Sequence, residues 1–176
     1  MAKEIIIIAT VLFVALVFYV ATKPDIFRVR RAASIKASPE RIFALISDFH
    51  NWIAWSPYEK IDPEMKRNLS GKSRGKGAVY EWESTDSHAG TGRMEIIESS
   101  PPSMIAIELD LIKPIESHCI LEFILETKGD ETDVTWAMHG TNPYIGKIME
   151  ILYDRDSMVG KDFEEGLANL KAIAER

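Results

Sequence analysis

The chain has 176 residues, of which 46% are hydrophobic and 27% charged, with a formal net charge of −6 at pH 7. This negative balance disfavours nucleic acid as a partner, because a phosphate backbone attracts a basic surface. The single cysteine, Cys119, excludes an intramolecular disulfide.

The first segment is an uncharged apolar run over residues 5–21, whose only polar groups are the hydroxyls of Thr10 and Tyr19. Its length is at the short end of the roughly 17–25 residues that span a bilayer. It exceeds the apolar region of a cleavable signal, about 7–15 residues, and no clear cleavage site follows it. We expect a retained membrane anchor and junction over 1–24 and one domain over 25–176, with a cleaved signal as the alternative.

Charge around the apolar run predicts its orientation. Lys3 precedes the run beside Glu4, whereas the segment after it is basic, with Asp25 as its one acidic residue. The basic residues there are Lys23, Arg28, Arg30, Arg31 and Lys36. Because basic residues flanking a span favour the cytoplasm, we expect a single-pass membrane protein with its domain on the cytoplasmic side.

The domain is expected to begin with a strand over 27–35, followed by a short helix that Ser38 caps. Phe49, Trp52 and Trp55 then recur every three residues, which places them on one face of a helical turn. This aromatic wedge, residues 49–55, is expected to pack against the domain, where it closes one side of a core or hollow.

Alternation of apolar and polar residues predicts the strands that follow. Their ranges are 64–70, 78–84, 91–99, 104–112, 117–127 and 131–140. In this register the side chains on the inner face are mostly apolar: Tyr80, Trp82, Met94, Ile96, Ile107, Leu109, Leu121, Phe123, Trp136 and Met138. Consecutive hairpins imply an antiparallel sheet with one face covered.

An apolar period near 3.6 from Ile145 to Leu170 predicts a helix of about thirty residues. The charged segment 154–156 marks a kink or a break in it. Gly166 lies near the apolar face, beside Phe163, and two interpretations of it remain open. The glycine permits close packing against the sheet, or it leaves room for a ligand.

Several short motifs occur in a characteristic order. They are Ser38–Phe43, Asp48–Trp52, Trp55–Pro57, Gly92–Ile96, Pro101-Pro102, Val134–Trp136 and Gly160–Lys171. In these the chain resembles the SRPBCC superfamily, the START-like and polyketide cyclase domains, and in particular its membrane-anchored bacterial-type members. The resemblance implies an α+β helix-grip fold, an antiparallel sheet of about six or seven strands wrapped around a long C-terminal helix. It also implies a hollow used for lipids, sterols, polyketides or plant hormones.

We therefore expect binding, with transport or sensing as its purpose, of a hydrophobic small molecule or lipid between sheet and C-terminal helix. The expected ligand-binding residues are Trp52, Trp55, Tyr80, Trp82, Met94, Ile107, Leu109, Phe123, Trp136, Met138, Phe163 and Gly166. An empty apolar cavity of about 300–1,000 Å³ would favour this function.

Two alternatives stay open. A cyclase or dehydratase-type enzyme would be favoured by a buried carboxylate or histidine beside a second polar group. A protein-binding module would have a filled core and an exposed apolar patch. No nucleophile motif, cofactor motif or metal site is recognisable, and His118 and Cys119 point to opposite faces of one strand, so a binding protein is preferred over an enzyme.

Overall fold

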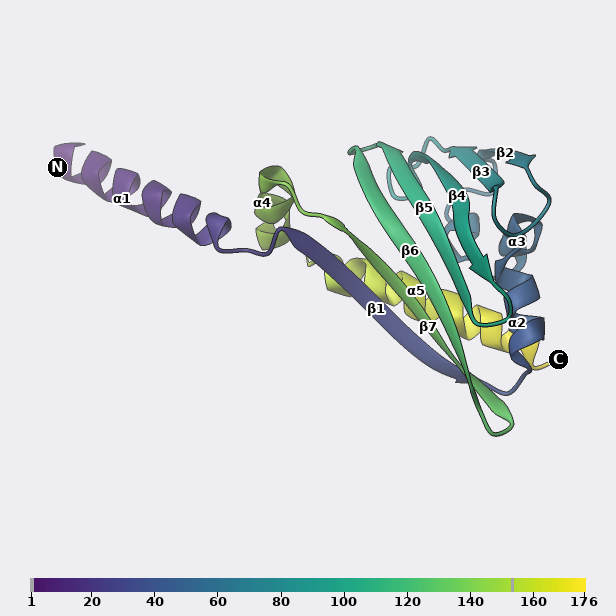
Figure 1. Ribbon diagram of the computed structural model, residues 1–176. Coiled ribbons are helices and arrows are strands. Elements are labelled where there is room, and N and C mark those ends of the chain that lie inside the picture. The colour runs from purple at the N-terminus through teal and green to yellow at the C-terminus, as the bar shows by residue number, and fades with distance from the viewer. Residues whose placement is uncertain (1, 153) are drawn as a thin grey trace.

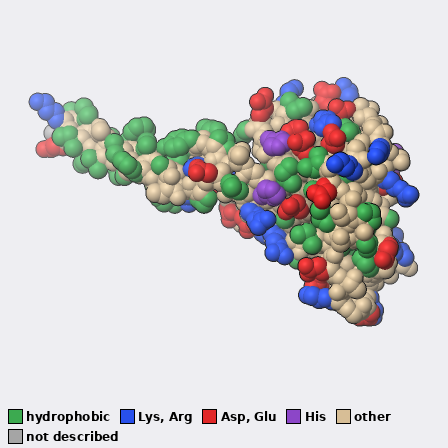
Figure 2. Space-filling model, in the orientation of Figure 1, with side chains coloured by type: hydrophobic (Ala, Val, Ile, Leu, Met, Phe, Trp, Pro, Cys, Tyr) green, Lys and Arg blue, Asp and Glu red, His purple; other side chains and the backbone are tan. Residues whose placement is uncertain are grey.

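The computed structural model describes residues 2–152 and 154–176, with the backbone alone at residues 149 and 152. Helix α1 (Ala2–Ala21) extends away from the rest of the chain, to the left in Figure 1. It is long and apolar enough to cross a membrane, and hydrophobic side chains cover its visible face in Figure 2. Such a helix is shared by membrane anchors and signal sequences.

A seven-stranded antiparallel sheet forms the body of the domain, in the order β1-β7-β6-β5-β4-β3-β2. The strands are β1 (Ile26–Ile35), β2 (Lys66–Gly71), β3 (Ala78–Glu83), β4 (Thr91–Ser100), β5 (Met104–Lys113), β6 (Ser117–Lys128) and β7 (Glu131–Thr141). All seven lie where strands are predicted, the first over 27–35 and the other six from the alternation. The last strand returns beside the first, with Val29 opposite Met138.

One face of this sheet is covered by helices, as Figure 1 shows. Long helix α5 (Arg155–Ala174) crosses it, and four short elements lie beside α5. These are α2 (Pro39–Ile46), η1 (Phe49–Asn51), α3 (Trp52–Trp55) and η2 (Pro57–Lys60). The predicted α+β helix-grip architecture is thereby confirmed.

The C-terminal segment forms two helices, so the prediction of one helix of thirty residues is wrong and that of a break at 154–156 is correct. Helix α4 (Tyr144–Leu152) ends before Asp154, and Asp154 begins α5. The Asp154 carboxylate accepts the backbone N–H of Ser157 at 3.2 Å, an N-cap that starts a new helix. The apolar stripe is therefore divided, and Ile145 on α4 is 62% exposed.

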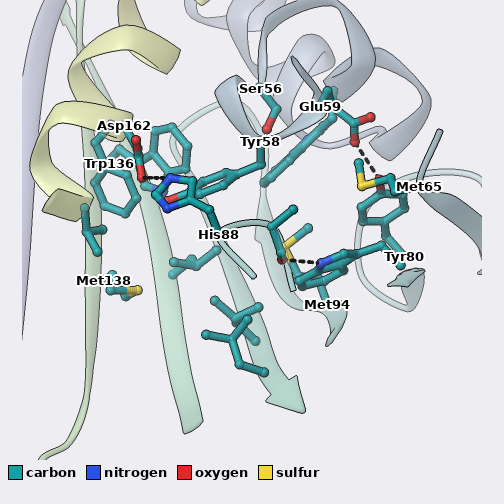
Figure 3. A pocket seen from close by; sticks show the side chains of 18 of the residues that line it. Ser56, Tyr58, Glu59, Met65, Tyr80, His88, Met94, Trp136, Met138 and Asp162 are labelled. Atoms are coloured by element: carbon teal, nitrogen blue, oxygen red, sulfur yellow. Dashed lines mark hydrogen bonds and ion pairs between the residues drawn. The ribbon is translucent and has the colours of Figure 1, made fainter. Parts of the chain in front are cut away.

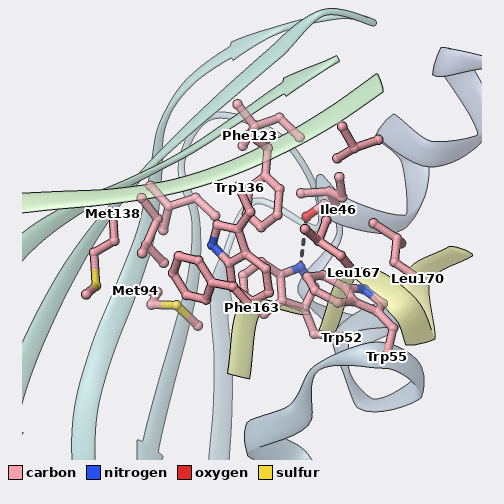
Figure 4. Close-up of a cluster of buried hydrophobic side chains, with 14 of the residues drawn as sticks. Ile46, Trp52, Trp55, Met94, Phe123, Trp136, Met138, Phe163, Leu167 and Leu170 are labelled. Carbon is pink, nitrogen blue, oxygen red and sulfur yellow. Dashed lines mark hydrogen bonds between the residues drawn. The ribbon is translucent and has the colours of Figure 1, made fainter. Parts of the chain in front are cut away.

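The aromatic wedge is buried, which confirms its expected packing (Figure 4). The indole of Trp52 donates to the carbonyl of Ile46 at 2.9 Å, and that of Trp55 donates to Leu45 at 3.3 Å. Both rings then meet Trp136 of β7 edge-on, at centroid distances of 6.5 and 5.6 Å. The wedge is thus bonded to α2 and packed against the sheet.

We expect Trp55→Ala to lower the free energy of unfolding by about 3–5 kcal/mol, because it empties a fully buried site and removes one hydrogen bond. Chemical denaturation of the detergent-solubilised chain, followed by circular dichroism, measures this change. Ile53→Ala on the same helix is the control: Ile53 is exposed, so its removal should cost less than about 0.5 kcal/mol. Equal midpoints for the two variants would contradict the packing argument.

Candidate functional site

A cavity of about 320 Å³ lies between the inner face of the sheet, the wedge and the first turns of α5 (Figure 3). Its walls are mainly aromatic, aliphatic and thioether side chains. The lining residues are Trp52, Ser56, Tyr58, Glu59, Met65, Tyr80, Trp82, Ser87, His88, Ala89, Met94, Leu109, Leu111, Leu121, Trp136, Met138, Met158, Val159, Asp162 and Phe163. Volume and lining fall within the range of small-molecule sites, about 300–1,000 Å³.

The structure brings eight of the twelve expected ligand-binding residues to this cavity. These are Trp52, Tyr80, Trp82, Met94, Leu109, Trp136, Met138 and Phe163. Trp55, Ile107 and Phe123 lie in the packed core, each with 0% exposure. Strand alternation for Ile107 and Phe123, and helical spacing for Trp55, assign these residues to the inner side correctly, but the inner side is part pocket and part core.

Gly166 fits the close-packing interpretation. A Cβ atom at this position would lie 2.6 Å from Cζ3 of Trp136 and 3.1 Å from Cδ of Pro57. The missing side chain lets Trp136 approach α5, where it stacks on Phe163 at a centroid distance of 4.0 Å and an angle of 8°. The absence of a side chain at Gly166 therefore permits close contact between α5 and the sheet.

A buried carboxylate, Glu59, forms one polar corner of the cavity. Its Oε1 accepts a hydrogen bond from the hydroxyl of Tyr80 at 2.5 Å (Figure 3). Its Oε2 accepts a hydrogen bond from Nε of Arg67 at 2.7 Å. Burial first, and then the hydrogen bond to Glu59, raise the pKa of the Tyr80 phenol well above its usual range. Because both oxygens are engaged and the charge is paired, Glu59 ties η2 to β3 across the cavity wall.

Sequence reasoning missed Glu59. It stands in a short helical turn after Pro57, and Arg67 lies in the next element along the chain, strand β2. Only the folded arrangement brings the two together, with Glu59 8% exposed.

A second polar corner lies at the opening of the cavity. Nε2 of His88 is 3.6 Å from Oδ2 of Asp162 (Figure 3), and burial followed by the Asp162 carboxylate raises the pKa of Tyr58. Among the described lining residues, the exposed ones are Ser87, His88 and Met158. The cavity therefore opens between the β3–β4 loop and the first turn of α5.

One donor on the cavity wall has no acceptor. Nε1 of Trp136 is buried without a hydrogen-bond partner among the described residues. Figure 4 shows this nitrogen on the side of the ring nearer Met138 and Met94, which both line the cavity. Since a buried indole N–H normally finds a partner, an acceptor on a bound molecule would complete it.

No group of three or more His, Cys, Asp and Glu side chains in residues 2–152 and 154–176 is placed to hold a metal ion. The histidines at 118 and 139 are on the outer face of the sheet, each beside acidic residues. His118 contacts Asp110 at 2.7 Å, and His139 lies 3.7 Å from Glu122. These pairs are separate from the cavity, so its chemistry rests on the two polar corners and the Trp136 donor.

Comparison with known proteins supports this fold. A family model described as polyketide cyclase/dehydrase and lipid transport matches residues 27–175. No curated protein sequence matches the chain. Protein CV1439 from Chromobacterium violaceum is similar in structure, with a TM-score of 0.60 and 16% identity over 88% of this chain and 99% of that one.

Two further solved structures agree. Protein MLL2253 from Mesorhizobium loti has a TM-score of 0.61 and 13% identity, over 84% of this chain and 96% of that one. The Aha1 dimer from Colwellia psychrerythraea has a TM-score of 0.57 and 18% identity, over 85% and 96%. At these identities the likeness establishes the fold alone.

We expect the stability of the chain to fall as pH rises above about 10, the ordinary pKa of tyrosine. Folded Tyr80 keeps its proton to higher pH than unfolded Tyr80 does, so the unfolded state binds fewer protons there and the free energy of unfolding decreases. Tyr80→Phe should make this decrease shallower by up to about 1.4 kcal/mol per pH unit. Denaturation midpoints at several alkaline pH values measure it, and identical slopes would show that Tyr80 ionises as freely folded as unfolded.

Proposed function

The chain belongs to the polyketide cyclase/dehydrase and lipid transport family, and we propose that it binds an apolar small molecule or lipid in its cavity. The observation that carries this proposal is the cavity itself, about 320 Å³ in volume and lined mainly by apolar side chains. A structural module would be expected to fill such a space, because protein interiors pack to crystal-like density. The modest volume favours one ring system or one acyl chain over a whole two-chain lipid.

The wall chemistry supports a ligand that is apolar along its length and polar at a few points. Met94 and Met138 are unbranched and polarizable, so they adapt to ligands of different shape. The indole N–H of Trp136 would donate to a carbonyl or hydroxyl oxygen of the ligand. At the opening, His88 and Asp162 would meet a polar end group that remains near water.

A second candidate function is favoured by the same opening. A histidine beside a carboxylate is a common acid–base pair, and His88 and Asp162 stand 3.6 Å apart on the cavity wall. In a cyclase or dehydratase-type enzyme they would move protons on a bound polyketide-like chain. Such an enzyme would change the mass or the ring count of its ligand, whereas a carrier returns it unaltered.

We also infer that α1 is a retained anchor that holds the domain at the cytoplasmic face of a membrane. Its supports are the uncharged run and the basic residues after it, among them Lys23 and Arg28. Anchoring suits a lipid-binding domain, because it keeps the cavity near a membrane from which apolar ligands can be drawn.

Filling the cavity should abolish binding. Leu109→Trp places a large side chain into the cavity. The fold should persist, because the added bulk enters a void and should cost less stability than the roughly 1–3 kcal/mol of overpacking a tight core. Native mass spectrometry of the full chain released from lipid nanodiscs measures the ligand carried, and its mass identifies the ligand.

The control for this experiment is Ile124→Trp, on the outer face of β6, where Ile124 is 38% exposed. Lipids bound to α1 remain in both variants, so the difference in bound ligand between the two variants measures binding in the cavity. Ligand carried equally by wild type, Leu109→Trp and Ile124→Trp would place the binding elsewhere, and no ligand on any of them would count against the proposal.

The orientation of the anchor has its own test. Alkaline phosphatase folds actively only outside the cytoplasm, so its fusion after Arg176 should be inactive, whereas a fluorescent protein fused there should be bright. A reversed pair of signals would place the domain on the other side of the membrane. Mass analysis of the mature N-terminus separates a retained anchor from a cleaved signal, which would leave a chain beginning near Thr22.

A further inference from the structure

Helix α4 shows its apolar side to the outside, the reverse of a usual surface helix. Of its described side chains, Tyr144 is 45% exposed, Ile145 62% and Ile151 42%. Its charged side chains turn inward instead: Lys147 is only 6% exposed. In water this arrangement leaves apolar area exposed, so the outer face of α4 is suited to an apolar surrounding.

The inward charges of α4 are each paired. Nζ of Lys147 is 2.6 Å from Oδ1 of Asp25, in the junction after α1. Glu150 accepts Nδ2 of Asn142 at 3.1 Å and lies 3.3 Å from Arg155. These pairs fix the orientation of α4 about its own axis, because rotating the helix would separate the charged groups from their partners. The apolar face is therefore held outward by the domain.

Helix α4 also lies beside the end of α1 (Figure 1). The Tyr144 hydroxyl donates to the carbonyl of Val17 at 3.3 Å, and Val20 is buried, with 1% exposure. Val17 is four residues before the last residue of α1, a rise of about 6 Å at 1.5 Å per residue. This places α4 at the level where a membrane-spanning α1 leaves the hydrocarbon. Interfacial helices lie at that level and bury their apolar faces about 5–10 Å into the boundary between headgroups and acyl chains.

We propose that α4 is an interfacial helix that lies in the membrane surface next to the anchor, with its exposed apolar face in contact with lipid. The proposal rests on the proposed membrane insertion of α1. The occupant of this face is a phospholipid bilayer, because its exposed side chains Tyr144, Ile145 and Ile151 are uncharged and the helix lies beside the end of apolar α1. The contact is therefore expected to need no anionic lipid.

This contact would orient the cavity. Antiparallel pairing of β1 with β7 places the start of β1 and the end of β7 at one end of the sheet. The hairpin order brings the β3–β4 loop, which carries His88 at the opening, to that same end. With both α1 and α4 held at the bilayer, the open end of the cavity is the end nearest the membrane.

Single cysteines carrying a polarity-sensitive fluorophore test the contact. Ile145→Cys and Ile151→Cys are labelled in the full-length chain and reconstituted into phosphatidylcholine vesicles. Native Cys119 stays unlabelled because it is buried, and burial raises the pKa of its thiol. The control is Ile53→Cys on α3, which is as exposed as Ile145, at 61%, but lies at the far end of the domain (Figure 1).

Lipids with a spin label in the acyl chain should remove most of the emission at positions 145 and 151, and little at 53. High salt should not restore it, since apolar contact is not screened. Equal emission at all three positions would overturn the proposal, as would a label at 145 that becomes shielded only when a soluble protein is added. This measurement does not depend on a ligand. If the labels are quenched in a chain that carries no ligand, the membrane contact is supported and the proposed cavity function is contradicted.

Discussion

The stack of Trp136 on Phe163 is the contact on which the rest of the domain depends. It joins the sheet to α5 ring against ring, at 4.0 Å, and Gly166 makes that approach possible. The wedge then closes around it, with Trp52 and Trp55 edge-on to the same indole. Because packing is tight at this point, the gap between helix and sheet is filled toward the C-terminal end of α5 and remains open near its first turns.

The cavity is thus a consequence of how far the filling extends. Leu167 and Leu170, on later turns of α5, are buried in the core, whereas Val159 and Asp162 line the opening. Larger side chains could fill this space, whereas the unbranched Met94 and Met138 line it and leave an adaptable wall. This open, adaptable space is the physical ground for the proposal that the domain binds a ligand.

Much of this architecture could be predicted from the sequence, because side chains alternate between the two faces of a strand. Where one face of the sheet is buried, the apolar residues therefore specify which face points inward. The alternation predicts an inward position for four residues that line the cavity: Tyr80, Trp82, Trp136 and Met138. The alternation cannot separate pocket from core, since it records direction and not distance. Phe123 has the same pattern as Trp136 and stacks on it at 4.9 Å, yet it is fully buried in the core. Glu59 enters the cavity wall through a pairing with Arg67 that no local sequence pattern indicates.

The C-terminal segment shows a different limit. Its apolar period continues through residues 154–156, but a capped break there gives α4 an orientation different from that of α5. Periodicity predicts that a helix has an apolar face and does not say what that face meets. For α4 the outward face is set by the pairing of Lys147 with Asp25, in the junction after α1. The junction that follows α1 therefore also sets the outward face of α4. The end of α1, α4 and the cavity opening share one end of the sheet, because the antiparallel strands return there.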